Sequence, residues 1–166
     1  MSVYKNLSGF KGDKLWVVAS GWFNPTYALT DGENQYGTIR HEGLFSSTSI
    51  LETASCCLAA LGAYNGDISL KTEEGKVIGY GGTTLFKPGL SLTLNNGSTY
   101  MLTQPNIWRA AYTWVSEVGD YIMHVDGNIL LSLIFSADKP FSEIPDFHLL
   151  VFTSVKYLVY LNSNAS

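Results

Sequence analysis

The sequence has few charges and very few arginines for its length. Only 14% of its 166 residues are charged, the formal net charge is -4, and the arginines are Arg40 and Arg109. Phosphate groups are bound by clustered Lys and Arg, and the lysines here are spread along the chain, so nucleic acid is not expected as a partner. A hydrophobic content of 46% also excludes the profile of a disordered chain and predicts one domain with a large core.

Cysteine is nearly absent, since the chain contains only Cys56 and Cys57. On a strand from Ala54 to Leu61 the two side chains would point to opposite faces. A disulfide between them would be strained, and metal ligands need other spacings, such as C-x2-C with partners elsewhere. We therefore expect buried, unreactive thiols, with pairing to a second molecule or a redox role as the alternative. No cofactor or metal site is predicted.

The chain also lacks long apolar runs. Its N-terminus has no apolar segment of the kind found in secretory signals. The run from Phe147 to Leu161 is shorter than the roughly 20 residues of a membrane span. Four polar side chains interrupt it, at His148, Thr153, Ser154 and Lys156. These features predict a cytoplasmic protein without a transmembrane span.

Short strand-like segments are abundant, and turn signals separate them about every 8 to 12 residues, as in a β-sandwich or barrel. Alternation is clearest at Leu90, Leu92 and Leu94, which predicts a strand with one buried face. Turns are predicted at Asp31-Gly32, Asn96-Gly97 and Asp126-Gly127. The twelve predicted strands are Leu15 to Ala19, Thr26 to Thr30, Tyr36 to Arg40, Ser46 to Glu52, Ser55 to Leu61, Asp67 to Lys71, Lys76 to Tyr80, Leu90 to Leu94, Thr99 to Thr103, Arg109 to Val115, Asp120 to Val125 and Ile129 to Phe135.

The C-terminal run is apolar on every side, which is typical of a helix inside a closed sheet. Asp146 is a suitable N-cap for it. The sequence therefore predicts a mainly β fold, a closed twelve-stranded antiparallel barrel around a C-terminal apolar helix near 146–161. The barrel domain spans 15–161, after an N-terminal extension at 1–14 and before a polar tail at 162–166. The β-branched and aromatic residues of the run would also suit a thirteenth strand.

A faint repeat offers a different architecture. Three hairpins share a hydroxyl residue, an acid and a glycine, at Thr30-Asp31-Gly32, Thr72 to Gly75 and Ser116 to Gly119. A spacing of about 40 to 45 residues also describes propeller blades. Propellers need about four or more blades and have no place for a terminal helix, so the barrel is preferred. The acidic hairpins are interpreted as solvated turns.

The chain resembles the superfamily of the tubby C-terminal domain, the LURP-one proteins and the phospholipid scramblases. The hairpins TYALTDGENQYGTIR, ISLKTEEGKVIGYGG and YTWVSEVGDYIMHV and the terminal PDFHLLVFTSVKYLVYL carry this resemblance, which covers about Leu15 to Leu161. It implies a barrel around a central helix, and by analogy of fold a role at lipid head groups. The chain departs from the family's functional features because it has no clustered bases, no cysteine-rich lipidation segment and no EF-hand-like run.

No catalytic motif is found. In Arg40-His41-Glu42 the histidine points away from its neighbours on a strand, so a solvated strand end is expected. His124 is interpreted as a core or edge histidine. Lys156 is expected near a rim, where it can reach solvent or an acid, and His148 at a barrel mouth.

A run of glycines and the aromatic residues of two loops are the remaining candidates for a binding site. Gly79, Gly81 and Gly82 lack the following helix of a phosphate loop, so bulges or a barrel corner are preferred. The loops 22–25 and 104–108 carry large aromatics, which we interpret as plugs of the barrel ends rather than as anchors for a partner.

The sequence favours a non-enzymatic binding or scaffolding module with an unknown protein partner. That hypothesis requires exposed aromatics such as Trp22, Phe23 and Trp108. The first alternative is a lipid or membrane-surface binder, which requires a contiguous basic face. The second is a small enzyme, which requires a cleft that holds a carboxylate with His41 or His124.

Overall fold

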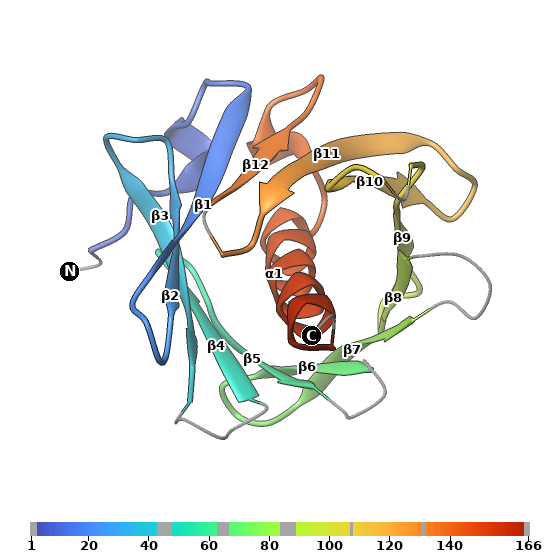
Figure 1. Ribbon diagram of the computed structural model, residues 1–166, viewed down its shortest axis with the longest axis horizontal. Helices are drawn as coiled ribbons and strands as arrows, with labels where there is room; N and C mark the ends of the chain where they lie inside the picture. Colours follow the sequence, from blue (N-terminus) through green and yellow to red (C-terminus); the bar gives the residue numbers. More distant parts are fainter. Residues whose placement is uncertain are drawn as a thin grey trace.

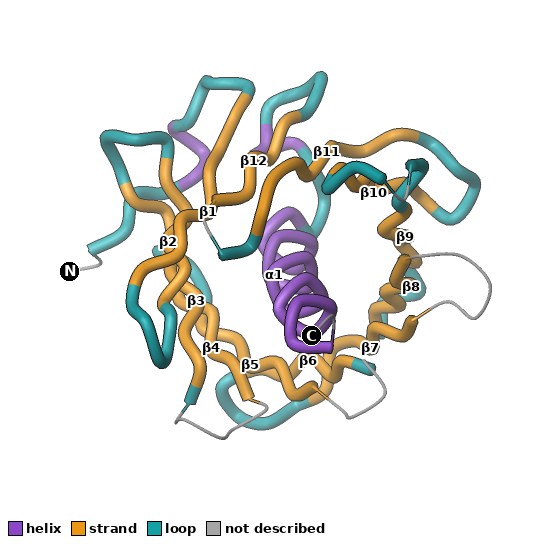
Figure 2. The backbone as a smooth tube through the Cα atoms, viewed as in Figure 1, coloured by secondary structure: helices purple, strands orange, loops and turns teal. Residues whose placement is uncertain are grey.

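Twelve antiparallel strands close into a barrel around one α-helix in the computed structural model (Figure 1; Figure 2). The structure describes residues 3–42, 48–62, 67–83, 89–106, 108–130 and 132–164. The strands are β1 (Lys14–Ser20), β2 (Thr26–Thr30), β3 (Gln35–His41), β4 (Thr48–Thr53), β5 (Cys57–Gly62), β6 (Ile68–Thr72), β7 (Val77–Thr83), β8 (Gly89–Leu94), β9 (Thr99–Thr103), β10 (Ala111–Ser116), β11 (Tyr121–Asn128) and β12 (Ser132–Ser136). The predicted fold class is confirmed.

Each strand pairs with its neighbours in sequence, and β1 pairs with β12 to close the sheet. The register of the closing pair runs from Lys14 opposite Ser136 to Val18 opposite Ser132. Closure gives every strand two partners and leaves no sheet edge. The propeller alternative is therefore wrong.

The helix α1 (Phe147–Asn164) fills the barrel. It packs most closely against β5 and β6. Its central residues from Leu150 to Val155 are all buried, including Thr153 and Ser154. A helix without a polar face is stable only where apolar groups surround it, and the inward leucines of β8 supply such groups. The thirteenth strand is therefore wrong, and the helix extends past 161 into the predicted polar tail.

The two ends of the barrel differ. At the end where α1 begins, which we call the cap end, the short 3-10 helices η1 (Leu7–Gly9) and η2 (Phe141–Glu143) contact each other. The ring of Phe10 lies 5.9 Å from that of Phe141 and 5.5 Å from that of Tyr36. We call the opposite end, where α1 finishes, the rim end. It carries the β1–β2, β3–β4, β5–β6, β7–β8, β9–β10 and β11–β12 connections.

Most strand boundaries agree with the prediction within two residues, but the turn predicted at Asp126-Gly127 is wrong. Strand β11 runs through both residues to Asn128, and Asp126 pairs with Ile134 of β12. Gly127 has a φ of 114°, and a Cβ there would collide with the carbonyl oxygen of Ser132. The glycine therefore allows β11 and β12 to approach each other closely within the sheet. The predicted strand start at Ser46 lies outside the described residues.

Candidate functional site

The largest exposed apolar side chains of the described residues gather in connections at the rim end. Trp22 is 97% exposed, Phe23 94% and Trp108 87%, and Leu130 is also well exposed. The interpretation of the loop aromatics as plugs is therefore wrong. These exposed side chains are the candidates for contact with a partner or a membrane surface.

Local turn chemistry holds these side chains outward. Gly21 has a φ of 95°, and the turn it makes precedes Trp22 and Phe23. The amide N–H of Trp108 donates to Oδ1 of Asn106 over 2.9 Å, and Leu130 N–H donates in the same way to Asn128. Such bonds are Asx turns, which fix tight loops by a side chain. Leu130 is not recognisable as a loop residue from the sequence, because the segment from Ile129 to Phe135 has the pattern of a strand.

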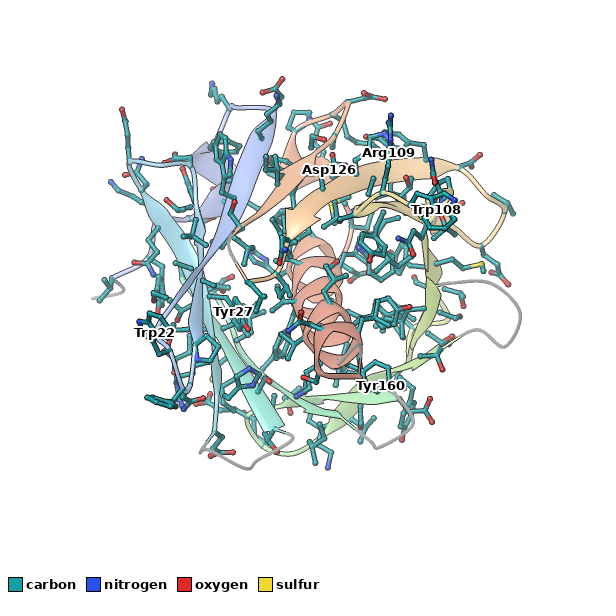
Figure 3. All side chains as sticks on the ribbon, in the orientation of Figure 1. Trp22, Tyr27, Trp108, Arg109, Asp126 and Tyr160 are labelled. Atoms are coloured by element: carbon teal, nitrogen blue, oxygen red, sulfur yellow. The ribbon has the colours of Figure 1, made fainter. Side chains whose placement is uncertain are left out.

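The three connections are consecutive around the rim. The strand order β2, β1, β12, β11, β10, β9 places the β11–β12 turn between the other two. Figure 3 shows Trp22 and Trp108 on opposite sides of α1. The exposed apolar side chains are therefore spread along an arc and do not form one compact cluster. We call Trp22, Phe23, Trp108 and Leu130 the apolar rim.

Charge is distributed unequally between the two ends. The described charged residues of the rim half are three bases and three acids, namely Arg40, Arg109, Lys156, Glu42, Asp67 and Asp126. The cap half has eleven acids and six lysines, namely Asp13, Asp31, Glu33, Glu52, Glu73, Glu74, Glu117, Asp120, Asp138, Glu143, Asp146, Lys5, Lys11, Lys14, Lys71, Lys76 and Lys139. The net negative charge of the described chain therefore lies at the cap end.

Inside the barrel, a hydrogen-bonded cluster joins α1 to two strands. Nζ of Lys156 lies 2.9 Å from Oγ of Ser49 on β4, and that oxygen lies 3.0 Å from Nδ1 of His41 on β3. The ring of Tyr27 meets the His41 ring edge-on at 6.0 Å. Lys156 is only 9% exposed, and its partner Ser49 belongs to the last register pair of β3 and β4, at the rim end. The predicted position near a rim agrees with this, but the ammonium group bonds to a buried hydroxyl group there. Ser49 has no recognisable sequence signal because its role depends on strand pairing.

Burial shifts the pKa values of this cluster. It lowers the pKa of Lys156 to about 8, since the protein interior disfavours the charged amine. The pKa of His41 is lowered by burial and then by the charge of Lys156. Ser49 is completely buried. A substrate could not reach its hydroxyl, so the cluster connects helix and barrel and does not form an open catalytic site.

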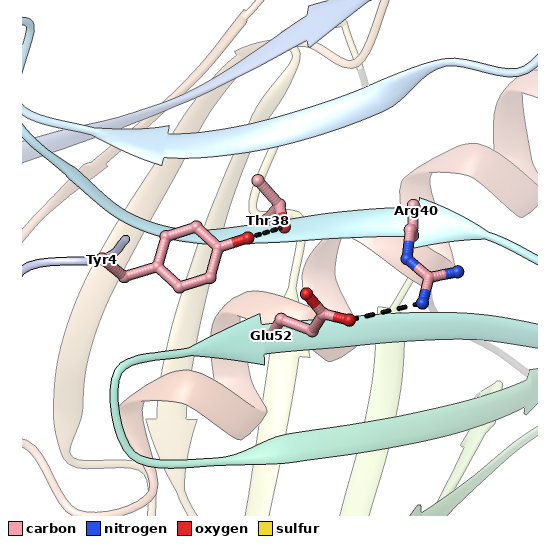
Figure 4. Close-up of polar contacts among 4 residues, drawn as sticks. All are labelled: Tyr4, Thr38, Arg40 and Glu52. Atoms are coloured by element: carbon pink, nitrogen blue, oxygen red, sulfur yellow. Dashed lines mark hydrogen bonds and ion pairs between the residues drawn. The ribbon is translucent and has the colours of Figure 1, made fainter. Parts of the chain in front are cut away.

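The solvated strand end predicted for residues 40–42 is found for Arg40 and Glu42 but is wrong for His41, which is half-buried and bonds to Ser49. Arg40 points away from His41 and forms an ion pair with Glu52 at 3.3 Å (Figure 4). The hydroxyl of Tyr4 bonds to Thr38 on the same face over 2.6 Å. Exposed ion pairs contribute about 0 to 1 kcal/mol, so this contact does not mark a site.

The second histidine lies in a shallow cleft at the cap end. His124 lines it with Asp13, Tyr121 and Asp138, and its Nδ1 lies 3.0 Å from Oγ1 of Thr113. The described His, Cys, Asp and Glu side chains include no group of three placed to hold a metal ion. The cleft thus brings carboxylates near a histidine, as the enzyme hypothesis requires, but it is a small, open surface feature.

A pocket of about 370 Å³ lies beside the start of α1. His148 and Cys56 line it, so His148 lies at the barrel end where it was expected. Burial lowers the pKa of His148 and raises that of the Cys57 thiol. Both cysteines are half-buried and not in a disulfide, so the expectation of buried thiols is wrong, while their low reactivity stays a prediction.

The glycine run lies inside β7, and the next described element is the strand β8, so no described helix follows at which a phosphate could bind. A Cβ at Gly79 would lie 2.7 Å from a methyl carbon of Leu94 and 3.0 Å from the Thr93 carbonyl oxygen. This glycine lets β7 approach β8, as expected of a barrel corner.

No helix in the described part of the chain combines the length and hydropathy that a bilayer span requires. No family model matches the sequence, and neither a curated protein nor a solved structure matches it.

Proposed function

We propose that this protein is a non-enzymatic cytoplasmic module that docks on a membrane surface through its apolar rim. The observation that carries the proposal is the exposure of Trp22, Phe23 and Trp108 at one end of the barrel. Tryptophan rings favour the boundary between lipid head groups and acyl chains because they combine an apolar body with a polar N–H.

The spread of the apolar rim favours a surface over a single protein pocket. Binding energy at protein interfaces concentrates in a few clustered residues. Trp22 and Trp108 lie on opposite sides of α1, so one pocket cannot hold both. A bilayer is laterally continuous and can receive anchors from separate loops at once.

The charge distribution supports the same orientation. Biological membranes with anionic lipids repel negative protein surfaces. The acidic cap end would therefore face away from such a membrane, while the rim end, with balanced described charges, can approach it. Binding is expected to depend mainly on apolar insertion and only weakly on salt, because no basic cluster is present among the described rim residues.

We also propose a relationship to the superfamily of tubby C-terminal domains, LURP-one proteins and phospholipid scramblases. The closed barrel with a buried C-terminal helix supports it. The rim would then replace the basic patch that the resemblance leads one to expect.

Vesicle co-sedimentation tests the proposed function. The full chain and the variant W22S/F23S/W108S are compared on neutral and anionic phospholipid vesicles at about 20 mM and about 150 mM salt. We expect the full chain to sediment with vesicles at both salt concentrations and the variant to lose at least about tenfold in affinity. V118S is the matched control, since Val118 is an exposed apolar residue at the cap end. Equal sedimentation of all three proteins, or none by the full chain, would contradict membrane docking.

A protein partner is the second candidate. Arg109 follows Trp108 directly, and Trp and Arg are the residue types most enriched in protein hot spots. If the function is to bind a protein partner, the full chain should not bind vesicles. The W108S variant should then lose a partner that the wild type binds in solution.

A further inference from the structure

A groove on the outer face of the barrel crosses β6, β7 and β8, a part of the wall that carries no residue of the apolar rim. It has a volume of about 790 Å³. Its lining includes Asp67, Ser69, Tyr80, Ser91 and Thr93. Tyr80 is 59% exposed, so packing of the core does not explain this tyrosine, and the proposed membrane docking does not involve it.

Strand pairing orders these side chains in two rows. Tyr80 pairs with Ser69 on one side and with Thr93 on the other, so hydroxyl groups flank its ring. In the next row Gly82 pairs with Ser91. Because residues two apart on a strand share a face, Gly82 lies on the same outer face as Tyr80.

Gly82 leaves a hollow beside the ring. Among the described residues, a Cβ at this position would meet one atom within 4 Å, Oδ1 of Asp67 at 3.4 Å. Packing therefore does not require glycine here, in contrast to Gly79. The missing side chain opens the groove and brings the Asp67 carboxylate to its wall.

The chemistry of the groove selects among ligands. The described residues of the lining include a carboxylate but no Lys or Arg, and such a lining disfavours phosphates and other anions. Both edges of β7 are already paired, so a peptide cannot bind by adding a strand. The lining of the groove is complementary to a neutral ring that has one apolar C–H face and a border of hydroxyl groups.

We propose that this groove binds a neutral carbohydrate chain. A sugar ring stacks its C–H face on Tyr80, since aromatic faces carry partial negative charge and C–H groups partial positive charge. Its hydroxyl groups donate to Asp67 and exchange hydrogen bonds with Ser69, Ser91 and Thr93. The hollow at Gly82 receives the neighbouring sugar.

Saturation-transfer difference NMR tests this inference with maltohexaose, cellohexaose and chitohexaose at about 5 mM, a concentration suited to weak affinities. We expect saturation transfer from the wild-type protein to at least one hexaose. The variants Y80A and G82V should reduce the signal at least about fivefold, because one removes the stacking surface and the other fills the hollow. Y80F keeps the ring and should retain most of the signal.

Absence of transfer to all three hexaoses from the wild type, or equal transfer from Y80A, would overturn the inference. Unchanged circular dichroism of each variant establishes that it is folded. The test is independent of membrane docking, because none of these variants alters the apolar rim, and W22S/F23S/W108S should bind the hexaose like the wild type.

Discussion

At the scale of single residues, the least expected feature is a lysine inside the barrel. Lys156 donates to Ser49, and its burial lowers its pKa to about 8. Burying an ammonium group costs free energy that hydrogen bonds only partly offset, and apolar replacements of buried charges are often neutral or stabilising. Lys156 is therefore the residue at which the free-energy cost of burying a charge can be measured.

We predict that K156M is more stable than the wild type by about 1 to 3 kcal/mol at pH 7, because methionine fills similar space without a charge. Urea unfolding monitored by circular dichroism measures the difference. K156Q, which keeps a polar group, should not show this gain. A destabilised K156M would mean that the ammonium group makes a net favourable contribution to folding.

The same lysine predicts a pH dependence. Its pKa is about 8 in the folded protein against a reference value of 10.5, so the unfolded chain binds more protons between these values. The contribution of Lys156 to the unfolding free energy therefore rises as pH increases from about 8 to about 10.5. Tyr36 and Tyr100, whose pKa values are raised to about 12, act in the opposite direction above pH 10. The difference in unfolding free energy between K156M and the wild type isolates the lysine, and it should shrink over this range.

Thr153 on α1 is also buried and polar but, unlike Lys156, its side chain has no hydrogen bond to the described residues. Oγ1 of Thr153 is buried and has no hydrogen-bond partner among the described residues. The neighbouring Ser154 contrasts with it, since it accepts from Nε1 of Trp114 at 2.8 Å and donates to the Leu150 carbonyl. We predict that T153V raises the unfolding free energy by about 1 kcal/mol, whereas S154A lowers it by about 1 to 3 kcal/mol. Thermal unfolding of the two variants checks this, and stabilisation by both would contradict it.

At the scale of elements, the start of α1 is fixed by a contact with the barrel wall. The hydroxyl of Tyr100 on β9 donates to the Asp146 carboxylate over 2.7 Å. The carbonyl of Asp146 accepts the first helical bond, from Leu150 N–H at 3.0 Å, while its φ is 58°. Aspartate tolerates this left-handed conformation better than most residues. The residue predicted as the N-cap thus ties helix to sheet through its carboxylate.

We predict that Y100F lowers the unfolding free energy by about 1.5 to 3 kcal/mol, the range for hydrogen bonds to charged groups. Chemical denaturation measures the change. Y112F is the matched control, because Tyr112 is also buried and its hydroxyl makes no hydrogen bond to the described residues. An equal loss in both variants would show that the effect comes from the hydroxyl group itself and not from its bond to Asp146.

At the scale of the whole molecule, α1 and the sheet form one core. The inward side chains of the barrel and the central residues of α1 belong to one buried cluster. A barrel without its helix would expose this cluster to water, and the loss of apolar burial would exceed the marginal stability of a typical domain.

We therefore predict that a chain ending at Asp146 does not fold. Near-UV circular dichroism should lose its fine structure, and the dye ANS should bind strongly. A chain ending at Leu161 should stay folded, because only the last, exposed turn of α1 is removed. Native spectra for the shorter truncation would contradict a core shared by helix and sheet.

The sequence by itself determined the architecture. Twelve segments of alternating side chains, separated by turn residues, followed by a run apolar on every side, leave few arrangements other than a barrel around a helix. Turns at Asp31-Gly32 and Asn96-Gly97 could be predicted because these residue pairs favour turns. Gly32 and Gly97 do have positive φ angles. Both features are local, and local patterns can be read along one chain.

Only the tertiary structure decided the sites. The contact of Lys156 with Ser49 joins residues 107 positions apart, and the position of Gly127 within β11 depends on its approach to β12. Whether Trp22 and Trp108 plug the barrel or face solvent depends on the direction in which folded loops leave the sheet. The hollow beside Tyr80 likewise needs three strands in register. Burial and exposure are properties of the assembled molecule, because they arise from which distant segments cover one another.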